Sequence, residues 1–368
     1  MAIFTDVLLD VTKNGRKLPT NEYKEFGLHP IIDQGQNDIA GYTDETSGLF
    51  SDVPAIIFGD HTRVIKYVDA PFFVGADGVK ILKAKDNKAN YKFLYYALSS
   101  AKIPNTGYNR HFKWLKEIDI PTYSEQEQSQ IVSELDKVID LIGLRTKQLE
   151  KLDLLVKSRF IEMFGDPETN PNNFAISSMT ELCKIIDGDR GKNYPKQEEF
   201  SEKGYCLFLN AKNVTSNGFD FSDCMYITKE KDELLSKGKL NRGDIVLTTR
   251  GTLGNLAFYT DGVPFENVRI NSGMVILRMD KSRMNEVYFI EQFKMQLDTI
   301  KKQIASGSAQ PQLPISTMNK IKMLVPDLAL QNQFAEFVEQ TDKSKLAIQQ
   351  SLKKLETLKK ALMQQYFG

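Results

Sequence analysis

One long stretch of this sequence occurs twice, and the repeat constrains the fold more than any other feature. Residues 124–165 begin shortly after Pro121 and end in Phe-Gly, and residues 327–368 follow Pro326 and end in the same way. Near their ends the two copies keep a constant offset of 203 positions, which pairs Leu149 with Leu352. A self-match at one long period indicates an internal duplication.

Both copies are predicted to be long helices. In the first copy, apolar residues recur every seven positions, as in the seam of a coiled coil, at Leu135, Ile142, Leu149, Val156 and Met163. Neither run contains an internal proline, and the glycine after each suits a left-handed helix end. A helix over residues 124–164 would be about 60 Å long, so the second copy is its expected partner. The alternative is two helical hairpins, each folded back on its own domain.

A globular unit precedes each predicted helix. In residues 1–121, short β-rich runs such as PAIIFGD and RVIKYV are followed by a segment with helical spacing at 90–100. Residues 172–326 repeat this plan, since Gly273 matches Gly78 and Ile276 matches Ile81 at an offset of 195. GDPETNPNNF, between the first helix and the second unit, has the composition of a linker.

The sequence therefore predicts a mixed α/β (α+β) chain of unit, helix, unit and helix. The expected segments are 1–121, 122–168, 169–326 and 327–368. Two similar halves pack most economically about a pseudo-twofold axis, which would make the long helices an antiparallel coiled coil. The arrangement would be effectively circular, with Gly368 near Met1.

Charge and composition limit the possible functions. The chain has 48 basic and 48 acidic residues, and residues 122–173 hold six basic residues against ten acidic ones. No broad basic surface is indicated, so nucleic-acid binding would depend on local clusters or on a partner. The three cysteines form no CxxC pair, which favours buried thiols in a reducing cytoplasm. No apolar run is long enough for a membrane span, so we expect a cytoplasmic protein with no membrane partner.

Several motif-like segments do not support a catalytic role. DGDRGKNYP lacks the spacing of a phosphate-binding loop, and NPNNF lacks the second proline of an adenine-methyltransferase tetrad. Pro326-Asp327 is not followed by the remaining elements of a nuclease core, and the three histidines have no metal-ligand spacing. We therefore expect no catalytic residue and no metal site in this chain.

One local cluster could contact DNA. The segment TGYNRHFKWLKEIDIP places aromatic, amide, guanidinium and ammonium groups close together, from Tyr108 to Trp114. Such groups contact phosphates and base edges. The alternative is that Phe112 and Trp114 belong to the core and that the other residues form a solvated turn.

The whole chain resembles the specificity subunit of type I restriction-modification systems. PDLALQNQFAEFV and LKKLETLKKALMQQYFG are similar to that family's repeated spacer. DGDRGKNYP, GDIVLTTRGTLG, GSAQPQLP and GYNRHFKWL are similar to segments of its target-recognition domains. The resemblance implies that each globular unit reads one half of a two-part site in double-stranded DNA, and that the helices set the distance between halves.

The resemblance also implies partners. Two modification subunits would bind S-adenosylmethionine and methylate adenine, and restriction subunits would use ATP and Mg²⁺, so this chain would hold no cofactor itself. The DNA contacts expected on this reading are Tyr108, Asn109, Arg110, His111 and Lys113 in the first unit, and Arg190, Lys192, Asn193, Tyr194, Arg250, Gln310 and Gln312 in the second. Three alternatives remain at this point: a recognition subunit whose partner fuses methyltransferase and nuclease, a stand-alone sequence-specific DNA-binding protein, and an enzyme whose active site the sequence does not reveal.

Overall fold

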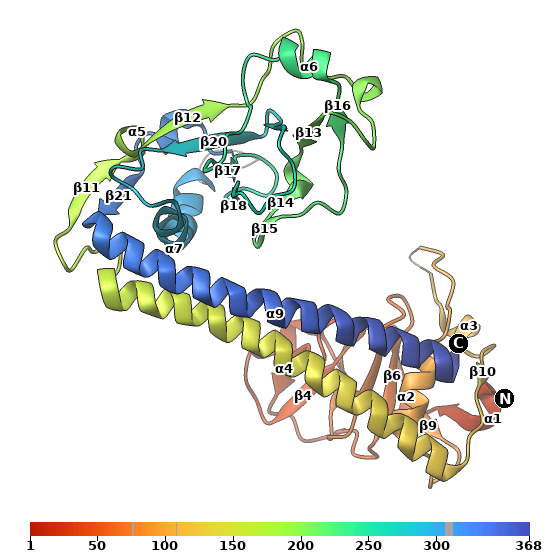
Figure 1. Ribbon diagram of the computed structural model, residues 1–368. Coiled ribbons are helices and arrows are strands. Elements are labelled where there is room, and N and C mark those ends of the chain that lie inside the picture. The colour runs from red at the N-terminus through yellow and green to blue at the C-terminus, as the bar shows by residue number, and fades with distance from the viewer. Residues whose placement is uncertain (76, 108, 306–311) are drawn as a thin grey trace. The chain divides into compact units, whose positions relative to one another are not determined.

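The chain forms two compact units in a computed structural model that describes residues 1–75, 77–107, 109–305 and 312–368 (Figure 1). Unit 1 consists of Met1–Lys147 and Ile348–Gly368, and unit 2 of Gln148–Ala347. Each unit therefore contains one part of each long helix. The four segments expected from the sequence follow the change from globular parts to helices, whereas the compact units divide both helices.

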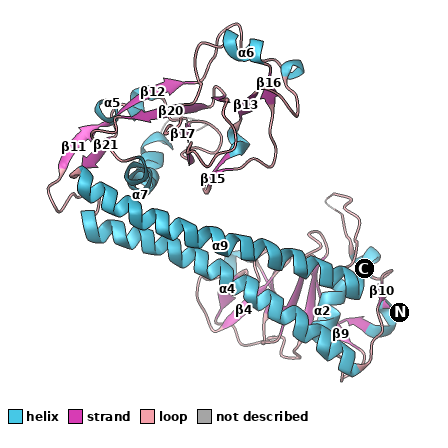
Figure 2. Cartoon of the chain, viewed as in Figure 1, coloured by secondary structure: helices cyan, strands magenta, loops and turns pink. Residues whose placement is uncertain are grey.

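The two duplicated stretches are unbroken helices, α4 (Glu125–Phe164) and α9 (Leu328–Phe367), as the heptad pattern predicted (Figure 2). Ser124 and Glu127 form the capping box of α4, because the Ser124 N–H donates to Glu127 Oε2 at 2.8 Å and the Glu127 N–H donates to Ser124 Oγ at 3.3 Å. Gly165, with φ of 75°, ends α4 in the left-handed conformation. An unbroken helix excludes the alternative of a helical hairpin in each half.

Within each unit the two helices pack against each other in opposite directions. In unit 1, Leu135 near the start of α4 shares a core with residues at the end of α9, and Tyr366 Oη donates to Glu134 Oε2 at 2.7 Å. In unit 2, Phe160 near the end of α4 packs on Phe334 near the start of α9, with ring centroids 5.4 Å apart. The helices are therefore antiparallel, as expected for the coiled coil.

Unit 1 is built on two four-stranded sheets, in the orders β2-β9-β6-β7 and β3-β8-β4-β5, and a small β1-β10 pair. In β6, all five residues are buried, which matches the apolar run PAIIFG in the sequence. The elements are β1 (Ala2–Ile3), α1 (Phe4–Val7), β2 (Leu8–Asp10), η1 (Thr12–Asn14), β3 (Lys17–Leu18), η2 (Thr20–Glu22), β4 (His29–Ile32), β5 (Gly41–Thr43), β6 (Ala55–Gly59), β7 (Ile65–Val68), β8 (Phe73–Gly75), β9 (Val79–Ala84), α2 (Tyr91–Ser99), α3 (Phe112–Leu115) and β10 (Asp119–Ile120).

Unit 2 has the sheets β12-β20-β17-β18 and β16-β13-β19, and the pairs β14-β15 and β11-β21. Of its three unpaired cysteines, Cys183 and Cys206 are buried as predicted, but Cys224 is only half-buried. The elements are β11 (Ala175–Ser178), α5 (Met179–Leu182), β12 (Cys183–Asp187), η3 (Gln197–Glu199), β13 (Cys206–Leu209), η4 (Ala211–Asn213), β14 (Val214–Thr215), β15 (Gly218–Phe219), β16 (Tyr226–Ile227), α6 (Lys229–Leu234), β17 (Ile245–Thr248), β18 (Leu256–Phe258), β19 (Val268–Ile270), β20 (Met274–Met279), α7 (Glu286–Ala305), α8 (Ile315–Met318) and β21 (Lys322–Val325).

The two units repeat individual hydrogen bonds as well as the order of elements. Asn90 caps α2 by accepting from the Phe93 N–H at 3.1 Å, and Asn285 caps α7 by accepting from the Tyr288 N–H at 3.2 Å. The side chain of Gln128 in α4 donates to the Tyr123 carbonyl at 2.9 Å. These shared bonds establish the duplication that the sequence offsets indicated.

The counterpart of Gln128 in α9 is Gln331, which is fully buried. Its Nε2 donates to the Pro326 carbonyl at 2.7 Å, and its Oε1 accepts from the Asn285 N–H at 2.8 Å. We expect Gln331→Ala to lower the free energy of unfolding by about 1–3 kcal/mol, because it leaves buried polar groups without partners. Urea unfolding measures this loss, and Gln333→Ala on the exposed face of the same turn should change it by less than about 0.5 kcal/mol. A loss of equal size in both variants would contradict the assignment.

Both chain ends belong to unit 1 (Figure 1). The Met1 amino group donates to Thr122 Oγ1 at 2.7 Å, and Tyr123 Oη donates to the Tyr366 carbonyl at 3.1 Å. The ring of Phe367 lies 5.4 Å from that of Phe93. The last part of α9 thus completes the unit that contains Met1, as the circular organisation predicted. Within the described ranges, no helix is both long and apolar enough to span a bilayer.

Candidate nucleic-acid interface

In unit 2, one edge of the β12-β20-β17-β18 sheet gathers several residues singled out from the sequence. Because β20 runs antiparallel to both β12 and β17, the ends of β12 and β17 lie beside the start of β20. Arg190 follows β12 and donates from Nη2 to the Ser272 carbonyl at 3.2 Å. Arg250 follows Thr249, whose N–H donates to the Gly273 carbonyl at 2.9 Å. Both arginines are exposed at this edge.

Gln312 reaches the same edge from a distant part of the chain. The next residue, Leu313, donates its N–H to the Thr249 carbonyl at 3.1 Å. The structure therefore brings Arg190, Arg250 and Gln312 together, all with exposed side chains. Gln310 lies outside the described residues.

The remaining predicted contacts of unit 2 follow Arg190 on one loop. Lys192 is exposed, whereas Asn193 and Tyr194 are half-buried. Asn193 Nδ2 donates to the Leu234 carbonyl at 3.1 Å, and the Tyr194 ring packs edge-on against Phe208 at 5.7 Å. Lys192 is therefore presented to solvent, while Asn193 and Tyr194 fasten the loop to the unit.

Asp189, which the sequence reading did not single out, fixes the start of this loop. The buried carboxylate accepts hydrogen bonds from the Gly191 N–H at 2.8 Å and from the Ser236 N–H and Oγ at 2.8 and 3.0 Å. Burial by itself raises the pKa of Asp189, but the hydrogen bonds from Gly191, Ser236 and Lys237 outweigh it, so the pKa lies below its ordinary value. The charged carboxylate is thus the form that the loop stabilises.

Replacing Asp189 with alanine should loosen the loop of residues 190–194. We expect a loss of about 1–3 kcal/mol in local stability, because the N–H groups of Gly191, Ser236 and Lys237 lose the charged acceptor that holds the loop. Hydrogen exchange in peptides covering 190–194 and 236–237 should therefore become faster, while peptides of unit 1 should be unchanged. Asp223→Ala, which removes an exposed carboxylate from the same unit, serves as the control. Equal exchange rates in the parent and Asp189→Ala would contradict this role.

Unit 1 repeats the same edge at the end of β6. The Asp60 N–H donates to the Gly78 carbonyl at 2.6 Å, as Thr249 does to Gly273. The His111 N–H donates to the Asp60 carbonyl at 2.8 Å, as Leu313 does to Thr249. Gly78 has φ of 84°, and a Cβ there would lie 2.7 Å from His61 Cδ2, so the turn requires glycine.

The predicted contacts of unit 1 divide into exposed and buried residues. Asn109, Arg110 and Lys113 are exposed beside a shallow pocket that Thr106 and Trp114 also line. Asn109 Nδ2 donates to the Thr106 carbonyl at 2.5 Å, and Lys113 Nζ lies 4.1 Å from the centre of the Trp114 ring. Tyr108 lies outside the described residues.

His111 differs from its neighbours because it is completely buried. Its Nδ1 lies 2.9 Å from the Asp60 carbonyl oxygen, its Nε2 lies 3.4 Å from Thr106 Oγ1, and its ring packs on Trp114. Phe112 is buried as well, and Trp114 is half-buried. Phe112 therefore belongs to the core, as the alternative held, and Trp114 lies at its border. The prediction of His111 as a DNA contact is not supported, because its ring is held inside the unit by Asp60, Thr106 and Trp114.

Comparison with known proteins places the chain in a family. The profile described as "Type I restriction modification DNA specificity domain" matches residues 6–154 and again residues 171–360. The chain belongs to this family. The double match of the specificity-domain family covers both units and most of both long helices, in agreement with the duplicated hydrogen bonds.

Two curated members of the specificity-domain family are similar in sequence. The type I restriction enzyme EcoR124I/EcoR124II specificity subunit of Escherichia coli is 27% identical over 220 residues, which cover 57% of this chain and 54% of that protein. The MjaIX specificity subunit of Methanocaldococcus jannaschii is 23% identical over 271 residues, covering 68% and 60%. The aligned part thus spans about half to three fifths of these relatives.

Solved structures share the fold. The S subunit of a type I restriction-modification system from M. genitalium matches with a TM-score of 0.60 at 19% identity, covering 100% of this chain and 95% of that one. A chain from a study of complex assembly and conformational transition in the type I R-M system matches with a TM-score of 0.53 at 16% identity, with coverage of 100% and 95%. At these identities the likeness concerns the fold alone.

Proposed function

We propose that this chain is the DNA specificity subunit of a type I restriction-modification complex, in which each unit reads one half of a two-part site in double-stranded DNA. One observation carries the proposal: the same hydrogen-bonded sheet edge occurs in both units, and each copy presents exposed arginine and amide side chains. Arginine pairs with guanine O6 and N7, and asparagine or glutamine pairs with adenine N6 and N7. Arg110 and Asn109 would read one half, and Arg190, Arg250 and Gln312 the other.

Under this proposal the chain recognises the DNA sequence, and its partner subunits catalyse the reactions. Two modification subunits would bind S-adenosylmethionine, flip the target adenine and methylate it, and restriction subunits would use ATP and Mg²⁺. The complex would act in the cytoplasm. Equal numbers of acidic and basic residues fit a subunit that shares the work of DNA binding with its partners.

The direct test is to map methylated adenines in DNA incubated with the modification subunits and S-adenosylmethionine, with and without this chain. We expect methylation at one two-part sequence only when the chain is present. Arg110→Ala should relax the specificity of one half-site, and Arg250→Ala that of the other, each by about 1–3 kcal/mol per lost base pair contact. Methylation at the same sites without the chain would overturn the proposal.

A further prediction concerns the spacing of the half-sites. A four-residue insertion beside Gly143, where a side chain would meet no neighbour within 4 Å, lengthens α4 by about 6 Å. If the helices set the distance, the preferred gap should grow by roughly two base pairs, at about 3.4 Å each. The methylated-site map of the insertion variant measures the gap. An unchanged gap, with both half-sites still recognised, would show that the helices do not set the distance between the half-sites.

A further inference from the structure

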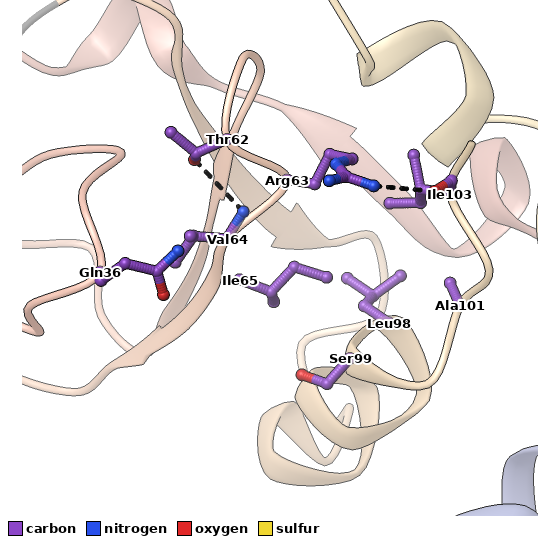
Figure 3. A pocket seen from close by; sticks show the side chains of 9 residues that line it. All are labelled: Gln36, Thr62, Arg63, Val64, Ile65, Leu98, Ser99, Ala101 and Ile103. Carbon is purple, nitrogen blue, oxygen red and sulfur yellow. Dashed lines mark hydrogen bonds between the residues drawn. The ribbon is translucent and has the colours of Figure 1, made fainter. Parts of the chain in front are cut away.

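A pocket lies beside the candidate interface of unit 1, and none of the predicted DNA contacts lines it. Figure 3 shows its walls, which come from the turn between β6 and β7 and from the end of α2 and the segment after it. The polar side chains around it are those of Gln36, Thr62, Arg63 and Ser99. The same two walls continue into the interface, because the turn contains Asp60 and because Ile103 leads to residues 105–110.

Arg63 holds an unusual backbone conformation at this pocket. Its φ is 63°, in the left-handed region where a side chain other than glycine or asparagine costs free energy. The tight turn requires this conformation, since the Arg63 N–H donates to the Gly59 carbonyl at 2.7 Å and the Gly59 N–H donates to the Val64 carbonyl at 2.8 Å. Glycine would fit this turn better, so the guanidinium is present at a cost to the fold.

The guanidinium of Arg63 has N–H groups that can donate to a ligand. Its Nη1 donates to the Ile103 carbonyl at 3.4 Å, a long bond that leaves the planar fork beside the pocket (Figure 3). The hydroxyl of Ser99 and the amide of Gln36 can also donate, whereas the Thr62 hydroxyl already donates to the Gln34 carbonyl at 2.6 Å. Among the described residues that line this pocket none is acidic, so its chemistry favours an anion.

Unit 2 has a pocket in the corresponding place. The Thr248 N–H donates to the Asn255 carbonyl at 3.0 Å, as Gly59 does to Val64, and the turn between these residues forms one wall. Lys301 of α7 and Lys212 of η4 supply the cations, and here too the lining residues that the structure describes include no acid. The two pockets therefore share position and charge, although the residues that carry the charge differ.

We propose that these two pockets bind backbone phosphates of the DNA that flanks each half-site. The inference rests on the proposed function, since a duplex that meets the sheet edge brings its backbone over the adjoining pocket. Arginine contacts phosphate through two parallel N–H groups. Such contacts set position and affinity but carry no sequence information. Arg63 would hold one strand beside the first half-site, and Lys301 and Lys212 would do so beside the second.

The test is the salt dependence of duplex binding by the chain assembled with its modification subunits. Arg63→Ala should reduce the slope of log K against log salt by about 0.9, the value for one lost phosphate contact. Its affinity should therefore fall about 3.5-fold less than that of the parent between 50 and 200 mM salt. The methylated sequence should not change. Lys301→Ala with Lys212→Ala should reduce the slope by about 1.8.

Three matched variants separate a phosphate contact from a structural role. Arg63→Gly should reduce the slope of log K against log salt as much as Arg63→Ala does, but without a lower unfolding temperature, because glycine adopts positive φ freely. Arg63→Lys should keep the slope of the parent. Lys24→Ala, which removes an exposed cation paired with Asp44 in unit 1, should leave the slope unchanged.

Two results would overturn the proposal: an unchanged slope in both Arg63→Ala and Arg63→Gly, or a changed methylated sequence, which would make Arg63 a base contact. The proposed function is judged separately, by whether the parent complex methylates a two-part site. The slopes can be compared on any duplex that the complex binds.

Discussion

Replacing Phe160 with alanine should lower the free energy of unfolding of unit 2 by about 3–5 kcal/mol, because the cavity cannot close among rigid rings. Phe160 is fully buried. Its ring centroid lies 4.9 Å from that of Phe164, 5.6 Å from that of Tyr288 and 5.4 Å from that of Phe334. This cluster joins α4, α7 and α9, so it ties both long helices to the globular part of the unit.

Urea unfolding followed by circular dichroism measures this loss, and hydrogen exchange locates it. Peptides of α7 and of the adjoining parts of α4 and α9 should exchange faster in Phe160→Ala. Leu154→Ala on the same helix is the control, because Leu154 is 62% exposed, and its effect should be below about 0.5 kcal/mol. Similar losses in the two variants would mean that the aromatic cluster does not hold the helices to the unit.

Asp232→Asn should also cost about 3–5 kcal/mol, since it removes one partner of a buried ion pair and leaves the other charge uncompensated. Asp232 and Arg269 form an ion pair in which both side chains are nearly inaccessible, and Lys239 Nζ lies 2.5 Å from Asp232 Oδ2. Arg269 also donates to the Leu235 carbonyl at 2.9 Å and to the Lys237 carbonyl at 2.6 Å. The pair thus shapes residues 232–237, where Asp189 is anchored.

The loss in Asp232→Asn should depend on pH. Burial alone raises the pKa of Asp232, but the hydrogen bonds and charges of Lys239 and Arg269 outweigh it and hold the pKa below its ordinary value of 3.8. A carboxyl whose pKa is lower in the folded state stabilises the fold above pH 3.8, and this stabilisation is lost as the pH falls through the folded-state pKa. The difference between parent and variant should therefore be full at pH 6–7 and shrink below pH 3.8.

Urea unfolding at several pH values tests this prediction. Glu233→Gln, in the next position of α6, is the matched control, because its ion pair with Lys229 is about two-thirds exposed and contributes at most about 1 kcal/mol. A loss in Asp232→Asn that stays constant from pH 7 to pH 3 would show that the carboxylate does not act through its charge.

Much of the fold could be predicted because the duplication leaves its mark in local patterns. The heptad positions of α4 are shielded from solvent, with Leu135 and Val156 buried and Ile142 and Leu149 half-buried between them. The offset that pairs Gly78 with Gly273 reappears as two matching hydrogen bonds at the sheet edges. Periodicity and repeated spacing report secondary structure and internal symmetry directly.

The candidate site was predicted less completely, because exposure depends on contacts between distant segments. His111 looks like its exposed neighbour Arg110 in the sequence, yet the Asp60 carbonyl draws it into the core. Asp189 and Asp232 were missed because their bonds to Ser236 and Arg269 join residues more than 30 positions apart. Arg63 was missed as well, because the amino-acid sequence does not indicate that an arginine in a turn has a positive φ.

Unit 1 is built from two separate parts of the chain, and this fixes the order in which the two units can be completed during synthesis. Unit 2 is one continuous segment, Gln148–Ala347, whereas unit 1 needs Ile348–Gly368 in addition to its first 147 residues. Phe93 gains its contact with the Phe367 ring only after residues 348–367 have left the ribosome. The unit that is translated first is therefore finished last, and until then the apolar surface awaiting the end of α9 stays open to solvent and to chaperones.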